Sequence, residues 1–237
     1  MKVESVVDLA TRYIEELIIT GKLKPGEQIK EDDIAGRLDI SRPPIREAMN
    51  SLEGEGLVVR KPRKGAFVIE MTEKDIWEVY TLKAELYAMA TSMAIDTITD
   101  GQIDLLKSLV EEMKNIATTE QRSILNYQKL HRRFHVKIME IAGNKRLFKF
   151  ASSLHKQIRR YSFQTLSYEE HLHTSNQYHQ QITDLIAKKD KVNARKLMKE
   201  HILKAMEFLL NESDILSDLA NNKRNNNKQG GPVLIKK

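Results

Sequence analysis

Apolar residues recur at intervals of three and four along most of the chain, which is the spacing of helices that bury one face. This pattern predicts helices over residues 3–20 and 31–38, and a third helix that runs from Arg42 to Glu55. After Gly56 the pattern changes to two short runs rich in β-branched residues, LVVR and AFVI, joined by KPRKG. Three helices followed by a hairpin with a basic tip predict a winged helix-turn-helix.

From Thr72 to about Leu216 the pattern stays helical and no run resembles a strand; the first segments are MTEKDIWEVYTLKAELYAMATSMAI and DGQIDLLKSLVEEMKNIA. We therefore expect a mainly α fold in two domains, a winged helix-turn-helix over residues 1–71 and an all-helical bundle over 72–215. Residues 216–237 are rich in Asn and Lys and lack periodicity, so we expect them to be disordered.

The third predicted helix has an unusual first turn, SRPPIR. Ser41 is a favourable N-cap residue, and Pro43 and Pro44 are tolerated only where helix amides lack partners within the helix, so they define its start. Arg42 and Arg46 lie off the apolar stripe near this end, where positive charge opposes the helix dipole. This placement predicts that an anion outside the helix binds the two arginines.

Composition removes several classes of protein. The 237 residues contain no run of about 18 apolar residues that could cross a membrane, and the charged amino terminus lacks the apolar segment of a signal peptide. We therefore expect a cytoplasmic protein without a membrane partner. The chain has no cysteine, which excludes disulfides and thiolate ligands, so a metal would need His, Asp or Glu.

The distribution of positive charge along the chain says more about a binding partner than the total net charge does. The chain carries a formal net charge of +6, yet residues 1–71 have a net charge of −1. In contrast, RKPRK over residues 60–64 places four cations in five residues beside the arginine-bearing helix. Such a helix is expected to enter the major groove of DNA, whose phosphates and guanines supply the external anion.

Three segments, GKLKPGEQI, LDISRPPIREAMNSLEGEGLV and KGAFV, occur in the order and spacing of the GntR family of bacterial transcriptional regulators, which the chain closely resembles. The alternative is that the arginines are ordinary surface charges, but the caps, the spacing and the hairpin together favour DNA binding. The resemblance implies that two arginines contact DNA from the recognition helix, that Ser and Pro lie near the DNA backbone and that Lys-Gly forms the wing tip. The implied DNA-binding residues are Ser41, Arg42, Pro44, Arg46, Lys64 and Gly65.

Four histidines fall on apolar faces of predicted helices. His131 and His135 are four residues apart and share one face, while His179 and His201 lie on the apolar stripes of two later segments. A single buried histidine is usually satisfied by a neighbour, but four would each need a polar partner. One shared metal ion would satisfy all four.

The helical region resembles the FCD effector domain of the FadR-like GntR subfamily, most clearly in HRRFHVKIMEIAGNKRL, YHQQITDLIAKKD and ARKLMKEHI. This resemblance implies that His135, His179 and His201 bind a divalent metal, with His131 at a position where the subfamily usually has Asp. Imidazole in place of a carboxylate moves the preference from Mg, Ca or Mn toward Zn, Ni or Co, so we expect zinc.

The ligand of the effector domain is expected to be a small carboxylate, because an ion held by neutral imidazoles keeps its positive charge and attracts an anionic oxygen. Where the subfamily often has an arginine for effector capture, this chain has Thr81. Lys83, Arg159 or Arg160 could replace that arginine, and the sequence leaves the choice open. A closed tetrahedral zinc site with a purely structural role is the alternative.

A metalloenzyme would need catalytic residues that the sequence lacks. His131 and His135 have the spacing of a zincin motif, but Arg132 occupies the place of its general base. A di-iron bundle needs Glu three residues before each ligand histidine, where Arg132, Asn176 and Met198 lie. We therefore expect a transcription factor, more commonly a repressor in this family, that binds a palindromic DNA operator as a homodimer.

Overall fold

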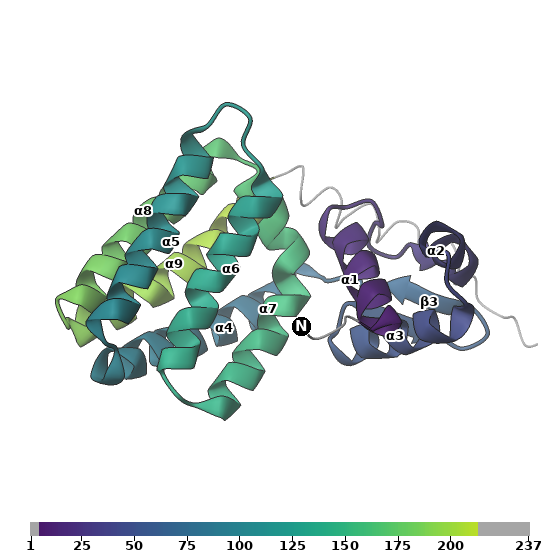
Figure 1. Cartoon of the computed structure of the whole chain (residues 1–237), viewed down its shortest axis with the longest axis horizontal. Helices are drawn as coiled ribbons and strands as arrows, with labels where there is room; N and C mark the ends of the chain where they lie inside the picture. Colours follow the sequence, from purple (N-terminus) through teal and green to yellow (C-terminus); the bar gives the residue numbers. More distant parts are fainter. Residues whose placement is uncertain (1–4, 213–237) are drawn as a thin grey trace, which may run out of the picture. The chain divides into compact units, whose positions relative to one another are not determined.

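The computed structural model describes residues 5–212, which divide into two compact units (Figure 1). The smaller unit contains the described residues up to Asp75, and the larger unit comprises Ile76–Leu209. The domain boundary predicted at Met71 lies close to this division. The tail predicted over residues 216–237 lies outside the described residues.

The smaller unit contains three helices and a small antiparallel sheet among its described residues. The helices are α1 (Val6–Ile19), α2 (Glu31–Leu38) and α3 (Arg42–Gly54), and the strands are β1 (Gln28–Ile29), β2 (Val58–Lys61) and β3 (Gly65–Val68). The strand order is β1-β3-β2. Strand β1 was not predicted, because two residues are too short to show an alternating pattern and their conformation depends on pairing with Phe67 and Ala66.

The core of the smaller unit lies between α1, α3 and the sheet. The apolar stripe predicted for the third helix, formed by Ile45, Ala48, Met49 and Leu52, is buried. Burying this stripe fixes the rotation of α3 about its axis, so that its two arginines face solvent. The local pattern therefore determines which side chains of α3 are available to a partner.

The turn before β1 ties the sequence motif KPGEQI to the sheet. Gly26 has a φ of 74°, and its N–H donates to the carbonyl of Val68 at 3.0 Å. A Cβ atom at this position would overlap the carboxylate of Glu70. Glycine is needed here both for the left-handed backbone and for the close approach.

The larger unit is the expected all-helical bundle, in which the described residues form six helices, and the described part of the chain has a mainly α fold, as expected. Helix α5 packs against α6 and α8, and α6 packs against α7 (Figure 1). Within the described part of the chain, no helix has the length and apolar character to cross a membrane. The six helices are α4 (Glu73–Thr97), α5 (Asp100–Thr118), α6 (Ile124–Ile141), α7 (Lys145–Leu166), α8 (Glu169–Ala187) and α9 (Lys191–Asn211).

Candidate DNA-binding surface and metal centre

The start of α3 lacks the side-chain cap that its sequence suggests. Ser41 has the extended backbone of an N-cap residue, with φ −72° and ψ 163°, but its side chain makes no capping hydrogen bond. A capping hydroxyl accepts from the amide of the second or third helical residue. Those residues are Pro43 and Pro44, which have no N–H, so the hydroxyl of Ser41 is exposed without a capping role.

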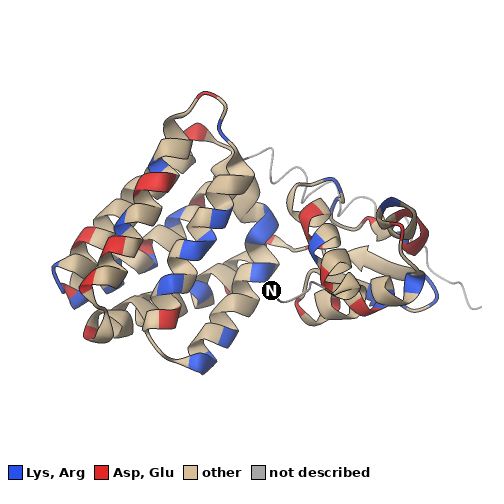
Figure 2. Ribbon diagram, viewed as in Figure 1, with Lys and Arg blue, Asp and Glu red and all other residues tan. Residues whose placement is uncertain are grey.

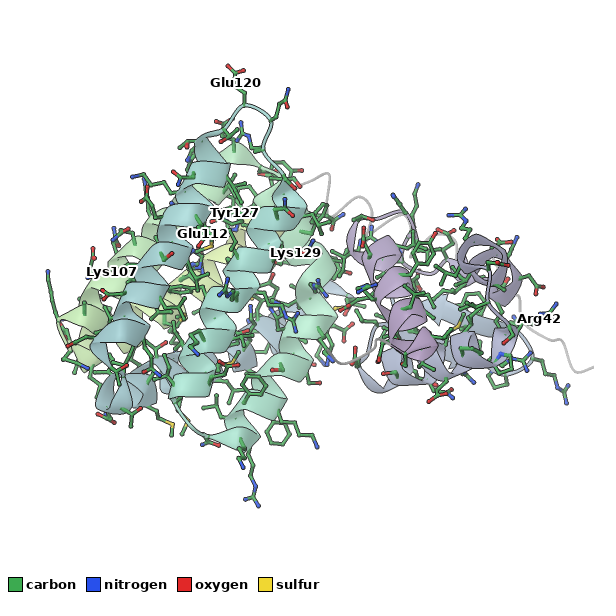
Figure 3. The ribbon with its side chains drawn as sticks, viewed as in Figure 1. Arg42, Lys107, Glu112, Glu120, Tyr127 and Lys129 are labelled. Atoms are coloured by element: carbon green, nitrogen blue, oxygen red, sulfur yellow. The ribbon has the colours of Figure 1, made fainter. Side chains whose placement is uncertain are left out.

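The two arginines of α3 are exposed but are not free of anions. The Nε atom of Arg42 lies 2.7 Å from Oδ1 of Asp32, and the Nε atom of Arg46 lies 2.7 Å from Oε2 of Glu31. Each arginine side chain is 58% exposed. Carboxylates in the first turn of α2, which lie outside α3, therefore already pair with both arginines, and their contact with DNA stays a prediction. Figure 2 shows this mixture of acidic and basic residues, and Figure 3 labels Arg42.

The hairpin between β2 and β3 presents the predicted wing. At its tip the Lys64 N–H donates to the carbonyl of Lys61 at 3.0 Å, and Gly65 has a φ of 90°. Within β2, Nη2 of Arg60 donates to the carbonyl of Arg46 at 3.1 Å, which links the hairpin to α3. A cavity of about 300 Å³ lies beside the hairpin, lined by Glu31, Arg60, Lys61, Pro62, Arg63, Gly65 and Ala66.

The structure brings the four predicted histidines of the bundle together. Helix α6 supplies His131 and His135, α8 supplies His179 and α9 supplies His201, and all four are buried. One ring nitrogen of each lies within 4.8 Å of those of the others. The Nε2 atoms of His135 and His179 are only 3.2 Å apart. Tyr127, labelled in Figure 3, stacks on His131 with ring centroids 6.3 Å apart.

Burial keeps these imidazoles neutral. It is the largest cause that lowers the pKa of each histidine below its ordinary value, and that of His179 falls to about 3. Repulsion from Lys83, and from neighbouring histidines when they are protonated, lowers the pKa values further. The Nδ1 atoms of His131, His135 and His179 have no hydrogen-bond partner among the described residues. Neutral imidazoles with converging nitrogens are the donor set of a divalent transition metal, so the group could hold one.

Lys83 is a buried cation next to this group. Only 4% of the residue is exposed, and burial lowers its pKa to about 7. Its Nζ atom lies 4.7 Å from the ring centroid of Tyr87 and 5.7 Å from that of Tyr80. Of the other two candidates for effector capture, Arg160 is buried and Arg159 is half-buried, both on α7.

Two more buried histidines, His155 and His171, were missed by the sequence prediction. Both ring nitrogens of His155 on α7 lack a hydrogen-bond partner among the described residues. It lies on the same helical face as the buried Ala151 and Ile158, so the apolar spacing could have identified it as inward-facing. It borders a cavity of about 240 Å³, lined by Tyr87, Arg132, Val136, Met139, Phe148, Ser152, His155 and Lys156. The ring of Tyr87 also contacts that of His135, at 5.1 Å between centroids.

Two family models together match most of the chain. The model for bacterial regulatory proteins of the gntR family matches residues 8–68, and the model for the FCD domain matches residues 78–204. The chain belongs to the GntR family. Its helical unit is an FCD domain, and the resemblance inferred from the sequence is confirmed.

The relatives of this GntR-family chain are regulators. It is 28% identical to the uncharacterized HTH-type transcriptional regulator YdhC of Bacillus subtilis, over 80% of this chain and 83% of the relative. It is also 28% identical to the Nta operon transcriptional regulator of Aminobacter aminovorans, over 82% and 90%. The structure of E. coli McbR/YncC shares the fold, with a TM-score of 0.75, 20% identity and coverage of 87% and 97%. The chain is therefore a DNA-binding transcriptional regulator and not an enzyme.

Proposed function

We propose that this regulator binds a palindromic operator as a homodimer in the cytoplasm, and that a small carboxylate bound at a metal in the FCD domain changes its affinity for DNA. The observation that carries the proposal is the convergence of four buried, neutral imidazoles in a chain whose recognition helix exposes two arginines. We further propose that the protein is a repressor, which the ligand releases from DNA.

On the DNA side, each residue has a chemical role. The guanidinium groups of Arg42 and Arg46 are long enough to reach guanine N7 and O6 in the major groove. The uncapped hydroxyl of Ser41 and the ammonium of Lys64 suit phosphate oxygens. Pro44 has a compact side chain and Gly65 has none, which lets the DNA backbone approach the start of the helix and the tip of the wing.

On the effector side, His131, His135, His179 and His201 would hold the metal. Zinc suits a site of imidazoles alone, with nickel and cobalt as the nearest alternatives. When bound, the ion would supply a positive charge that polarises and attracts an oxygen ligand. The donor nitrogens lie within 4.8 Å of one another, a wider span than the about 3.4 Å expected from tetrahedral Zn–N bonds of about 2.1 Å. Because the Nε2 atoms of His135 and His179 are only 3.2 Å apart, the spacing by itself fits an open and a closed site equally.

The residues around the metal favour an acid as the effector. We propose that Lys83 takes the role of the arginine that the subfamily often carries, because it is buried and its charge acts on all four histidines. Arg159 and Arg160 remain as secondary candidates. The cavity of about 240 Å³ beside His155 is lined by neither the four histidines nor Lys83, so its volume does not set the size of an effector bound at the metal.

The competing proposal is a structural metal site. The complete burial of His179 and the low exposure of the other three histidines favour it, because a catalytic or sensing metal usually keeps an open position. In that case the metal would stabilise the bundle and no organic acid would bind to it.

Thermal unfolding with and without metal distinguishes the two proposals. Native mass spectrometry first identifies the metal and the oligomeric state of the purified full-length chain. For a sensing site we expect that some mono-, di- or tricarboxylates raise the melting temperature of the metal-loaded protein, because they bind only the folded state. The same acids should weaken binding to operator DNA.

The control is His135→Ala, which removes one ligand on α6. It should abolish the response to acids while the protein still binds DNA through the smaller unit. If no acid changes melting or DNA affinity although the metal is present, the site is structural and the carboxylate proposal is wrong.

A further inference from the structure

The cavity of about 240 Å³ beside His155 lies between α6 and α7, and none of the four histidines of the proposed metal site lines it. Tyr87 of α4 forms a third wall. The two helices line the cavity with residues that recur at helical spacing, so that each helix contributes one continuous stripe. These residues are Arg132, Val136 and Met139 of α6, and Phe148, Ser152, His155 and Lys156 of α7.

The charged groups around this cavity suit an anion. Arg132 and Lys156 contribute two positive charges, and no acidic residue is part of the lining. Arg132 is exposed at the edge of the cavity, and no acidic side chain of the described residues pairs with it. Its charge favours the ionised form of Tyr87 and the neutral form of His155, so the guanidinium group lies near both of these walls.

His155 gives a separate indication of a ligand. Only 5% of the residue is exposed, and neither ring nitrogen has a hydrogen-bond partner among the described residues. Buried polar groups are nearly always hydrogen-bonded, so this ring needs a partner that the surrounding side chains do not supply. Burial is the largest cause that lowers its pKa, and a neutral imidazole has one N–H that can donate to an anionic oxygen.

The apolar part of the lining limits the kind of anion. Val136 and Met139 face Phe148 across the cavity, and the ring of Tyr87 adds a further apolar surface. The volume is below the range of about 300–1,000 Å³ that is usual for pockets holding drug-sized ligands. An occupant would therefore combine one acidic group with a compact apolar body.

We propose that this cavity is a second ligand site of the bundle, which binds a compact monocarboxylate with an apolar body and does not use the metal. The carboxylate pairs with Arg132 and accepts hydrogen bonds from Ser152 and His155, while the body packs on the apolar side chains of the same two helices. This site differs from the proposed effector site, where an acid binds to the metal itself. The two sites are neighbours, because the ring of Tyr87 lines the cavity and also contacts that of His135.

Isothermal titration calorimetry of the full-length protein with three probes tests the chemistry of the site. Benzoate has the acid and the apolar body, benzyl alcohol has a similar body without the charge, and inorganic phosphate has the charge without the body. We expect benzoate to bind once per chain and the other two probes to bind much more weakly. Phosphate or benzyl alcohol binding as tightly as benzoate would overturn the proposal, and so would the absence of benzoate binding.

Two arginine variants test the location. Arg132→Gln should weaken benzoate by about tenfold, as expected for the loss of one hydrogen bond between charged groups. The matched control is Arg133→Gln, which removes the same charge from the next position of α6, where the side chain is exposed and does not line the cavity. It should bind benzoate like wild type. Equal losses in the two variants would mean that only the net charge of α6 matters, and the proposed site would be wrong.

A third variant separates this site from the metal centre. His201→Ala removes a proposed metal ligand that lies outside the cavity, and it should leave benzoate binding unchanged. If this variant does not fold, as thermal melting would show, wild-type protein treated with a metal chelator replaces it. Loss of benzoate binding there, together with an unchanged affinity in Arg132→Gln, would mean that the acid binds at the metal. That result would overturn the second site and support the proposed function.

Discussion

His171 on α8 is a buried histidine outside the proposed metal centre. Its ring stacks on that of Phe208 with centroids 4.6 Å apart, and burial lowers its pKa to about 4. It belongs to neither the proposed metal site nor the cavity beside His155. Its positive charge, once it is protonated, lowers the pKa of His179 and of His201, so its protonation also affects two of the proposed metal ligands.

The low pKa of His171 predicts a loss of stability in acid. The unfolded chain binds a proton at this residue near pH 6.5, whereas the folded chain binds it only near pH 4. Its contribution to the free energy of unfolding is therefore complete above pH 6.5 and is lost as the pH falls toward 4, by about 3 kcal/mol in total. Urea unfolding at pH 7 and pH 5 measures the effect. The variant His171→Phe keeps the ring stack and should lose less stability than wild type on acidification; an identical loss would contradict the prediction.

Individual elements differ in how far the sequence predicted them. Helices with a repeated apolar face, such as α2 and α3, have nearly the predicted bounds, because burial of that face is local information. Strand β1 was missed because its structure depends on a partner far along the chain. The ion pairs of Arg42 and Arg46 were missed for the same reason, since periodicity within α3 contains no information about α2.

The wing is the element whose DNA contact is easiest to test. Arg63→Gln and Lys64→Gln together remove two charges at its tip without shortening the hairpin. If each contacts a phosphate, the slope of log K against log salt should become less steep by about 1.8. Binding titrations at four or five salt concentrations provide the slope.

The matched control for the wing removes two exposed lysines from α5, Lys107→Gln and Lys114→Gln, which changes the net charge equally. Its slope should stay close to that of wild type. If both double variants reduce the slope equally, only the total charge matters and the wing makes no specific contact.

At the scale of the whole molecule, the sequence predicted the two-domain plan and the convergence of four histidines. It did so because a helix spacing of four residues puts His131 and His135 on one face, and because each partner histidine lies within an apolar stripe. The sequence could not predict which basic residues surround them. Lys83 and His155 approach the group from α4 and α7, and only the packing of the bundle determines that.

The proposed dimer makes a prediction about the operator. Two recognition helices related by a two-fold axis can contact two half-sites only when both face the same side of the duplex. The test starts from a palindromic operator that the wild-type protein selects from a random DNA library. Inserting five base pairs between its half-sites turns one of them by about half a helical turn relative to the other. The affinity should then fall to that of a duplex with one half-site, whereas unchanged affinity would mean that each chain binds alone.

The prolines at the start of α3 have a consequence for how this regulator can change its target. Most helices can hold a phosphate with the free amides of their first turn, whatever side chains they carry. Here two of those amides are missing at Pro43 and Pro44, so the backbone offers DNA little at this position. Affinity at this end of the helix must come from the side chains of Ser41, Arg42 and Arg46. Their exposure means that a few substitutions could give the protein a new operator while the fold stays the same.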